Sequence, residues 1–361
     1  MTTPHLHPPP AERGEVGRGV EPKCIYFGTC GGCAFQDLDY SEQLEVKRQS
    51  VEEALNGFGS FPIHPTIPSP KPYHYRHMVA MTVKRRHNAL HLGFVAGDQT
   101  TFLPIESCPI ADERINKFLP EALIKLEGLP PERKFHTSQV VLRIGNDGEV
   151  VTSLRTDRGR KLEAKIGGKI FSYSMSSFFQ NNFSILESFV KVVRMFLNPP
   201  PLSSPRKAGG GREGGRGTLF DLYSGVGFLG ISLADSYKRA VGIEEGFEAV
   251  QHAKQNAERN GVKNVSFLEG KVEKLLPELT AEIARPFHVI IDPPRKGLKP
   301  EVIECLTKLP IDRLVYVSCS LEALRRDLQL LTDRFQIVEV QPLDFFPQTN
   351  HIETVVLLKP R

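Results

Sequence analysis

Five of the six cysteines in this chain lie in contexts that suit metal binding or nucleophilic chemistry. Cys24, Cys30 and Cys33 fall within the run C-I-Y-F-G-T-C-G-G-C, and Cys108 follows in E-S-C-P-I. Four thiolates are the usual ligands of an iron–sulfur cluster, and glycines let the main chain bend around its inorganic core. We therefore predict a cluster here. A four-cysteine zinc site is the nearest alternative, although only Cys30 and Cys33 form the close pair that such sites repeat, and free or disulfide-bonded thiols are the other.

A glycine-rich turn follows the first predicted strand of the second half of the chain. Gly225, Gly227 and Gly230 form the pattern G-x-G-x-x-G, and Glu244 ends the next predicted strand, where a carboxylate suits ribose hydroxyls. This pattern fits a nicotinamide dinucleotide as well as S-adenosylmethionine. Asp221, just before the turn, and the downstream motifs favour the methyl donor.

Two further predicted strands end in side chains that can do chemistry. Asp292 begins D-P-P-R after H-V-I-I, and Cys319 lies in V-Y-V-S-C-S. D-P-P loops of methyltransferases that act on planar nitrogen carry an aromatic residue after the prolines, whereas Arg295 stands here. A cysteine at a strand end is by itself more often a core residue. Glu353, however, starts the last predicted strand, which in a doubly wound fold lies near the same rim.

A thiol, a carboxylate and a sulfonium methyl donor in one cleft indicate methylation of a pyrimidine carbon. Carbon 5 of uracil is too weak a nucleophile to attack a methyl group unaided. Addition of the Cys319 thiolate at carbon 6 would make an enolate that carries charge at carbon 5. After methyl transfer a base must remove the carbon 5 proton so that the thiol can leave, and we assign that step to Glu353.

The pattern of predicted elements divides the chain into two unlike halves. The first half has a helix from Ser41 and then short β-type runs with turn residues between them, which indicates a small, mainly antiparallel α+β domain. The second half alternates strands with helices, as in a doubly wound, Rossmann-like α/β sheet. We expect a disordered arm at 1–20, the first domain at 21–165, and the second domain at 166–361 with a flexible Pro/Gly-rich insertion at about 198–217.

The composition indicates a globular protein with a mild preference for acidic partners. The chain has 361 residues, is 40% hydrophobic and carries a formal net charge of +4. It has no apolar run near the roughly 18 residues of a membrane span and no secretory signal, so we expect a cytoplasmic location and no membrane partner. Residues 71–87 hold five Lys or Arg, three His and two Tyr without an acid. Such a segment can follow single-stranded nucleic acid, or it can be an ordinary solvated strand pair.

Taken together, these motifs resemble those of the RNA 5-methyluridine methyltransferases. The resemblance is to the branch that has an iron–sulfur cluster and modifies 23S ribosomal RNA, and it runs from Cys24 to near the end of the chain. It rests on C-x5-C-G-G-C, E-S-C-P-I, S-F-F-Q-N-N, D-L-Y-S-G-V-G, V-G-I-E, D-P-P-R-K-G, V-Y-V-S-C-S and F-P-Q-T-N-H-I-E. It implies a class I methyltransferase domain, an RNA substrate and no obligatory protein partner.

The resemblance also implies roles for individual residues. Cys319 would be the nucleophile and Glu353 the base. A 4Fe-4S cluster would be held by Cys24, Cys30, Cys33 and Cys108. S-adenosylmethionine would be contacted by Gln180, Tyr223, Glu244 and Asp292.

Two departures from the family pattern affect these expectations. Asn-Pro commonly follows the catalytic cysteine, whereas Ser320-Leu321 follows here, so the loop must take another shape. Many members begin with a β-barrel RNA-binding domain that the short arm before Cys24 cannot hold, which favours 23S ribosomal RNA over transfer RNA as the expected substrate. Two other functions stay open: a dinucleotide-dependent iron–sulfur oxidoreductase, which leaves Cys319 and Glu353 without roles, and a non-catalytic RNA-binding protein.

Overall fold

The computed structural model describes residues 19–87, 89–128, 137–145, 148–154, 160, 162–197, 216–281 and 287–361. The predicted arm and insertion lie outside these residues, apart from 19–20 and 216–217. None of the described helices is long and apolar enough to cross a membrane.

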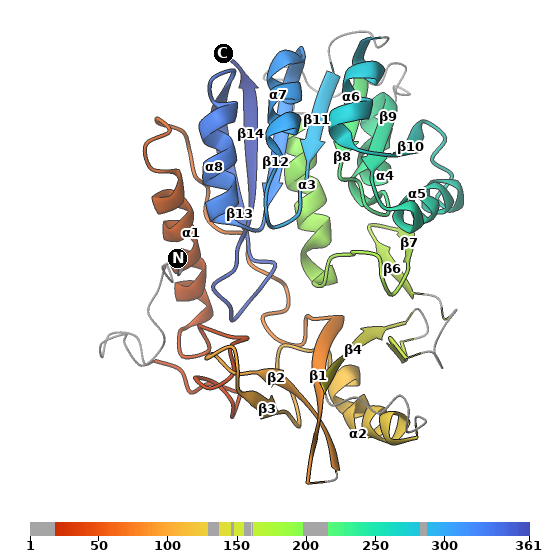
Figure 1. The fold of residues 1–361 in the computed structure, drawn as a ribbon. Coiled ribbons are helices and arrows are strands. Elements are labelled where there is room, and N and C mark those ends of the chain that lie inside the picture. The colour runs from red at the N-terminus through yellow and green to blue at the C-terminus, as the bar shows by residue number, and fades with distance from the viewer. Residues whose placement is uncertain are drawn as a thin grey trace, which may run out of the picture.

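A seven-stranded sheet forms the second half, as the alternation of elements predicts (Figure 1). Its order is β10-β9-β8-β11-β12-β14-β13. The first five of these strands pair in parallel, and β14 runs antiparallel to both of its neighbours. The bounds are β8 (Arg216–Leu222), β9 (Tyr237–Glu244), β10 (Val265–Glu269), β11 (Phe287–Ile291), β12 (Ile311–Ser318), β13 (Phe335–Leu343) and β14 (Glu353–Pro360).

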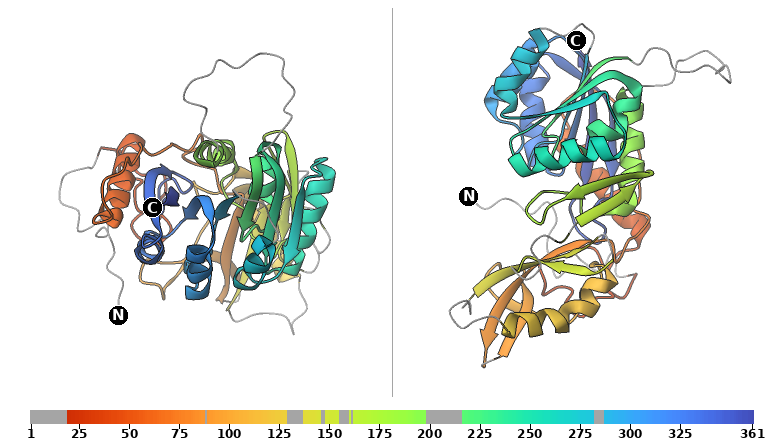
Figure 2. Two further views of the ribbon diagram at one scale, coloured as in Figure 1. Left: turned by 90° about the horizontal axis from the view of Figure 1, so that it is seen from above. Right: turned by 90° about the vertical axis from the view of Figure 1, so that its right-hand side faces the viewer.

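Helices cover both faces of this sheet, because its central strands are apolar on both sides (Figure 2). All five residues of β11 are buried, for example. One face packs against α3 (Leu186–Leu197), α4 (Phe228–Leu233), the short turn η4 (Ala234–Ser236) and α5 (Phe247–Arg259). The other packs against α6 (Val272–Ala281), α7 (Pro300–Lys308) and α8 (Leu321–Leu331). The chain crosses from one side of β8 to the other between β9 and β11, and ligands of such sheets bind at this switch point, beyond the carboxyl ends of the strands.

A five-stranded sheet of order β3-β2-β1-β4-β5 forms the first half, and its pairings are antiparallel, as predicted. Helix α2 (Glu113–Glu127) packs on it through a buried face that includes Ile115, Leu119 and Leu126. Asp112 caps this helix by accepting a hydrogen bond from the Arg114 N–H. The strands are β1 (Met78–Arg86), β2 (Ala89–Val95), β3 (Phe102–Pro104), β4 (Thr137–Ile144) and β5 (Val150–Thr152).

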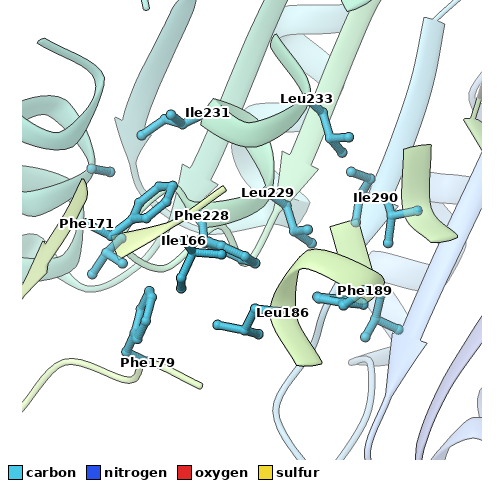
Figure 3. Packing of buried hydrophobic residues seen from close by; sticks show 14 of the residues in the cluster. Ile166, Phe171, Phe179, Leu186, Phe189, Phe228, Leu229, Ile231, Leu233 and Ile290 are labelled. Carbon is cyan, nitrogen blue, oxygen red and sulfur yellow. The ribbon is translucent and has the colours of Figure 1, made fainter. Parts of the chain in front are cut away.

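Two elements join the halves. Helix α1 (Tyr40–Leu55) lies within the first predicted domain, yet its Val51 and Leu55 are buried in the core of the seven-stranded sheet. The hairpin of β6 (Leu162–Ile166) and β7 (Lys169–Tyr173) packs against α4 and α5. Figure 3 shows the aromatic contact between Phe171 of this hairpin and Phe228 of α4, whose ring centroids are 5.1 Å apart. A short turn, η3 (Phe183–Ile185), then leads into α3.

Candidate active site

The glycine-rich turn after β8 forms one wall of a cleft at the switch point. Tyr223, Gly225 and Gly227 all have positive φ angles, of 64°, 51° and 83°. A Cβ atom at Gly227 would come within 2.6 Å of the Phe267 ring, so only glycine fits there. The Gly225 N–H donates a hydrogen bond of 3.0 Å to Glu244 Oε2, and this ties the turn to the end of β9.

Three of the four residues expected to bind the methyl donor line this cleft, namely Gln180, Tyr223 and Asp292. Glu244 lies beside it through its hydrogen bond to Gly225. Phe178 also lines the cleft, and it is 71% exposed. Sequence reasoning did not assign a role to Phe178. The only available signal was its place in S-F-F-Q-N-N, two residues before the predicted ligand Gln180.

Three carboxyl groups lie at this end of the sheet, of which those of Asp221 and Glu353 are buried and that of Asp292 is partly buried. Burial raises the pKa of Asp221 to about 7, although its Oδ2 accepts a 2.8 Å hydrogen bond from the Gly230 N–H. Burial, and then the charge of Asp221, raise the pKa of Asp292 to about 7. Burial and the charge of Asp292 also raise the pKa of Glu353 well above its ordinary value, while Arg295 opposes this. A group of mutually repelling acids suits a cationic ligand, since a positive charge would favour their ionised forms.

Cys319 and Glu353 are neighbours because of strand register. Ser318 of β12 pairs with Thr354 of β14, so the residue after Ser318 and the residue before Thr354 lie together at one edge of the sheet. Burial and then the Glu353 charge raise the pKa of the Cys319 thiol to about 11, whereas Arg295 lowers it by its charge and a hydrogen bond. The structure therefore brings together the predicted nucleophile and base, together with an arginine to which sequence reasoning gave no role.

The residues after Cys319 show how the chain accommodates its departure from Asn-Pro. Ser320 is the N-cap of α8, and its side chain accepts a hydrogen bond from the Ala323 N–H. The Ser318 hydroxyl donates a 3.0 Å hydrogen bond to the Ser320 carbonyl. These two bonds fix the strand-to-helix junction on which Cys319 lies.

The four N-terminal cysteines come into electrostatic range of one another. The charge of Cys108 raises the pKa values of Cys24, Cys30 and Cys33, in each case as an addition to the larger effect of burial. For Cys33 the result is a pKa of about 12. Asn116 holds Cys108 in place through two hydrogen bonds to its main chain, of 2.9 and 3.0 Å.

The described residues do not gather three or more His, Cys, Asp or Glu side chains in metal-binding geometry. The chemistry of the site nevertheless fits a cluster. Four free thiols lie close enough to affect one another electrostatically, and a bound metal would offset the repulsion between their ionised forms. Gln36 is 1% exposed, its Oε1 accepts a 3.0 Å hydrogen bond from the Cys24 N–H, and a hydrogen bond from its side chain lowers the pKa of Cys33. A buried donor of this kind is suited to a cluster sulfur.

The basic segment 71–87 is not one continuous surface. Arg76 lies beside the cysteines, since its charge lowers the pKa values of Cys30 and Cys33. Lys84 and Arg86 of β1 instead lie over the Phe102 ring, with charged groups 5.9 and 5.2 Å from its centroid. Of these residues, Lys84 and Arg86 belong to the β1–β2 hairpin and Arg76 does not.

Comparison with known proteins identifies related RNA methyltransferases. Residues 211–361 match the family model described as tRNA (Uracil-5-)-methyltransferase. An uncharacterized RNA methyltransferase of Gloeobacter violaceus is 31% identical over 94% of this chain and 83% of its own length. The tRNA (uracil(54)-C(5))-methyltransferase of Schizosaccharomyces pombe is 30% identical over 93% of this chain and 65% of its own length.

The fold is similar to that of a solved structure. The Pyrococcus abyssi tRNA (uracil-54, C5)-methyltransferase, determined with S-adenosyl-L-homocysteine, matches with a TM-score of 0.64 and 24% identity. The match covers 91% of this chain and 86% of that one. The similarity extends over both halves of the molecule.

Proposed function

Because this chain belongs to the RNA (uracil-5-)-methyltransferase family, and so methylates carbon 5 of uracil in RNA with S-adenosylmethionine, we propose that Cys319 is its nucleophile and Glu353 its base. The observation that carries the proposal is the strand register that makes these two residues neighbours beside the donor cleft. An oxidoreductase or a non-catalytic RNA-binding protein does not fit this family.

The proposed reaction conserves atoms and electrons at each step. The Cys319 sulfur forms a bond to carbon 6 of uracil, and the electrons of the 5,6 double bond move into an enolate. Carbon 5 then takes the methyl group, which the bound donor supplies as an electrophile on its sulfonium sulfur. Glu353 removes the carbon 5 proton, the double bond re-forms, and the Cys319 thiolate leaves.

The raised pKa values of Cys319 and Glu353 bear on how this cycle starts. Even with the effect of Arg295 included, the pKa of the Cys319 thiol is about 11, so the thiol is almost wholly protonated at neutral pH and adduct formation depends on the groups that favour the thiolate. Arg295 supplies a positive charge and a hydrogen bond to that sulfur, and it also favours the ionised form of Glu353. We assign Arg295 to the activation of the nucleophile.

For the donor, we propose contacts from Gln180, Tyr223, Glu244 and Asp292. Gln180, Tyr223 and Asp292 line the cleft, and Glu244 is at the position where acids of such folds bind ribose hydroxyls. Asp221 and Asp292 also line the cleft, where their ionised forms would attract a cationic sulfonium.

We propose a 4Fe-4S cluster at the N-terminal cysteines. Its ligands would be Cys24, Cys30, Cys33 and Cys108. The donor set supports this assignment, as does the buried Gln36 amide, which hydrogen-bonds both Cys24 and Cys33. When bound, the cluster would join the segment 24–33 to Cys108, which lies five residues before the start of α2 at Glu113. The RNA substrate that we propose is 23S ribosomal RNA, on the resemblance of the cysteine motif. Transfer RNA is the second candidate, since two of the similar proteins carry that substrate in their names.

Two experiments test this function. Tritium release from RNA labelled at carbon 5 of uracil, with S-adenosylmethionine present, reports the reaction itself, and Cys319→Ala should abolish it. Mass mapping of 23S ribosomal RNA and transfer RNA from cells with and without the protein identifies the substrate. A uridine in 23S RNA that loses its methyl group supports the first candidate, and a loss confined to transfer RNA supports the second.

A further inference from the structure

The loop of residues 344–352 connects the base to the N-terminal cysteines. It joins β13 to β14, and its ends are clamped by the pairing of Leu343 with Glu353. In Figure 1 this loop extends away from the seven-stranded sheet toward the N-terminal segments. Most of its residues are buried, although connecting loops usually lie on the surface. Its shape is therefore determined by what packs around it, and Glu353 is the next residue along the chain.

Gln348 lies where the loop meets the cysteine segment. It is 2% exposed and has a φ of 70°, a conformation that a non-glycine residue keeps only when its surroundings impose it. Its carbonyl oxygen accepts hydrogen bonds from the Ala34 N–H at 2.8 Å and the Phe35 N–H at 3.1 Å. Ala34 directly follows Cys33, so the main chain of the cysteine segment is bonded to this loop.

Gln43 of α1 forms two hydrogen bonds with Gln348, one as donor and one as acceptor. Its Nε2 donates to Gln348 Oε1 and its Oε1 accepts from the Gln348 N–H, both at 3.1 Å. The same Nε2 donates to the Phe35 carbonyl at 2.9 Å. One buried amide therefore holds the cysteine segment and the loop together, and such a bond network is costly to break because it leaves buried donors without partners.

The start of the loop is held by a separate anchor. Lys47 Nζ is 2.6 Å from Asp344 Oδ1, and the two side chains are 1% and 0% exposed. The Tyr40 hydroxyl donates a 2.9 Å hydrogen bond to Asp344 Oδ2. This anchor fixes the side of the loop near β13. The part of the loop that leads to Glu353 begins at Gln348, whose carbonyl oxygen accepts the hydrogen bonds from the cysteine segment.

We propose that Gln348 is a positioning residue that makes the placement of the general base depend on an ordered cysteine segment. This rests on the proposed function, in which Glu353 is the base and the cysteines hold a cluster. When the cysteine segment is ordered, Ala34, Phe35 and Gln43 impose the strained conformation of Gln348. The loop 344–352 then places Glu353 beside Cys319. When the segment loses its bound group, Gln348 loses the partners that impose its conformation, and the elimination step slows before the addition step does.

The first experiment separates this role from general destabilisation. Gln348→Met keeps the side-chain volume and removes the acceptor of the Gln43 Nε2 hydrogen bond. Gln43→Met removes that bond, the bond from the Gln348 N–H, and the bonds to the Phe35 and Leu38 carbonyls. Gln341→Met is the matched control, since Gln341 is 7% exposed and donates to the Pro65 and Pro342 carbonyls without reaching the cysteine segment. Each variant is incubated with RNA and S-adenosylmethionine, and the fraction trapped as a covalent adduct is measured on a denaturing gel.

We expect the two variants that break the Gln43–Gln348 pair to retain their iron and to trap about tenfold more adduct than the control, because a misplaced base slows proton removal. Equal trapping in all three variants overturns the positioning role, while the Glu353→Gln adduct still stands. If Glu353→Gln itself traps no adduct, the proposed function fails instead.

The second experiment tests the link to the cysteines without using activity. Hydrogen–deuterium exchange is measured for peptides that cover residues 344–352 in the iron-loaded protein and in Cys33→Ser. We expect faster exchange in the variant, in this loop and in residues 34–38 together, while β11 is unchanged. Unchanged exchange of the loop when residues 34–38 become mobile overturns the coupling.

Discussion

Arg295 hydrogen-bonds the Cys319 thiol and lowers its pKa, but burial and the charge of Glu353 have the larger effect, and the resulting pKa is about 11. The two residues come from different segments, one from the loop after β11 and one from the end of β12. The proposed nucleophile would therefore depend for its activation on a loop that also carries Asp292 of the cleft.

Arg295→Met should slow the reaction of Cys319 and shift its pH dependence upward. With a thiol pKa near 11, the rate of Cys319 alkylation by iodoacetamide should rise about tenfold per pH unit between about pH 7 and 10, since only the thiolate reacts. Removal of the guanidinium raises the pKa further, so the curve should move to higher pH. Quantification of the modified Cys319 peptide by mass spectrometry measures this. Lys296→Met, at the exposed neighbouring position, is the control, and an equal shift in both variants would remove Arg295 from this role.

Asp221→Asn should alter how stability changes with pH. The folded-state pKa of Asp221 is about 7, above its ordinary value, so the folded state binds this proton more tightly than the unfolded state does. Its contribution to stability is present at acidic pH and is lost as pH rises through about 7. Between pH 5 and 8 the donor-free native protein should lose on the order of 2–4 kcal/mol more unfolding free energy than the variant. Asparagine keeps an acceptor for Gly230. Urea unfolding at the two pH values tests this, and parallel losses would contradict it.

Cys108→Ala should remove most of the iron. Anaerobically purified native protein should be brown and contain about four irons per chain, because thiolate-to-iron charge transfer absorbs visible light. The variant should also lose stability in the first half of the chain, since Cys108 would join its far end to the segment 24–33. Cys305→Ala, which changes a partly buried cysteine of α7, should keep the iron. A colourless native protein with one zinc per chain would contradict the cluster.

The β1–β2 hairpin should contribute to RNA affinity through charge. Arg85→Ala combined with Arg86→Ala should weaken RNA binding and reduce the slope of log affinity against log salt by up to about two, since fewer counterions are released. Binding measured at several salt concentrations tests this. Lys308→Ala, at an exposed position of α7, is the control. An unaltered slope would make the hairpin an ordinary surface.

Arg76→Ala should instead lower the iron content of the protein, because Arg76 lies beside the cysteines.

Much of the second half could be predicted because its signals are local. A glycine turn after an apolar strand, alternating elements, and polar residues at strand ends together require a doubly wound sheet with its site at one edge. The neighbouring positions of Cys319 and Glu353 follow from such a sheet once the last strand lies beside β12.

Other features depend on contacts that sequence periodicity does not report. The apolar face of α1 predicts burial but not that Val51 packs on the seven-stranded sheet. The bond between Gln43 and Gln348 joins residues 305 positions apart, and neither residue type suggests a site. Arg76 appears in the sequence as one of several basic residues near β1, and only the fold separates it from Arg86.

The most direct test of the catalytic assignment is a denaturing gel of protein with RNA and S-adenosylmethionine. Glu353→Gln should let the thiolate add and the methyl group transfer but leave the carbon 5 proton without a base, so a band shifted by the RNA should accumulate and depend on the donor. Cys319→Ala should give neither methylation nor a shifted band, and the double variant should also give none. Methylated uridine formed by Cys319→Ala, or an equal shifted band in the double variant, would contradict the assignment.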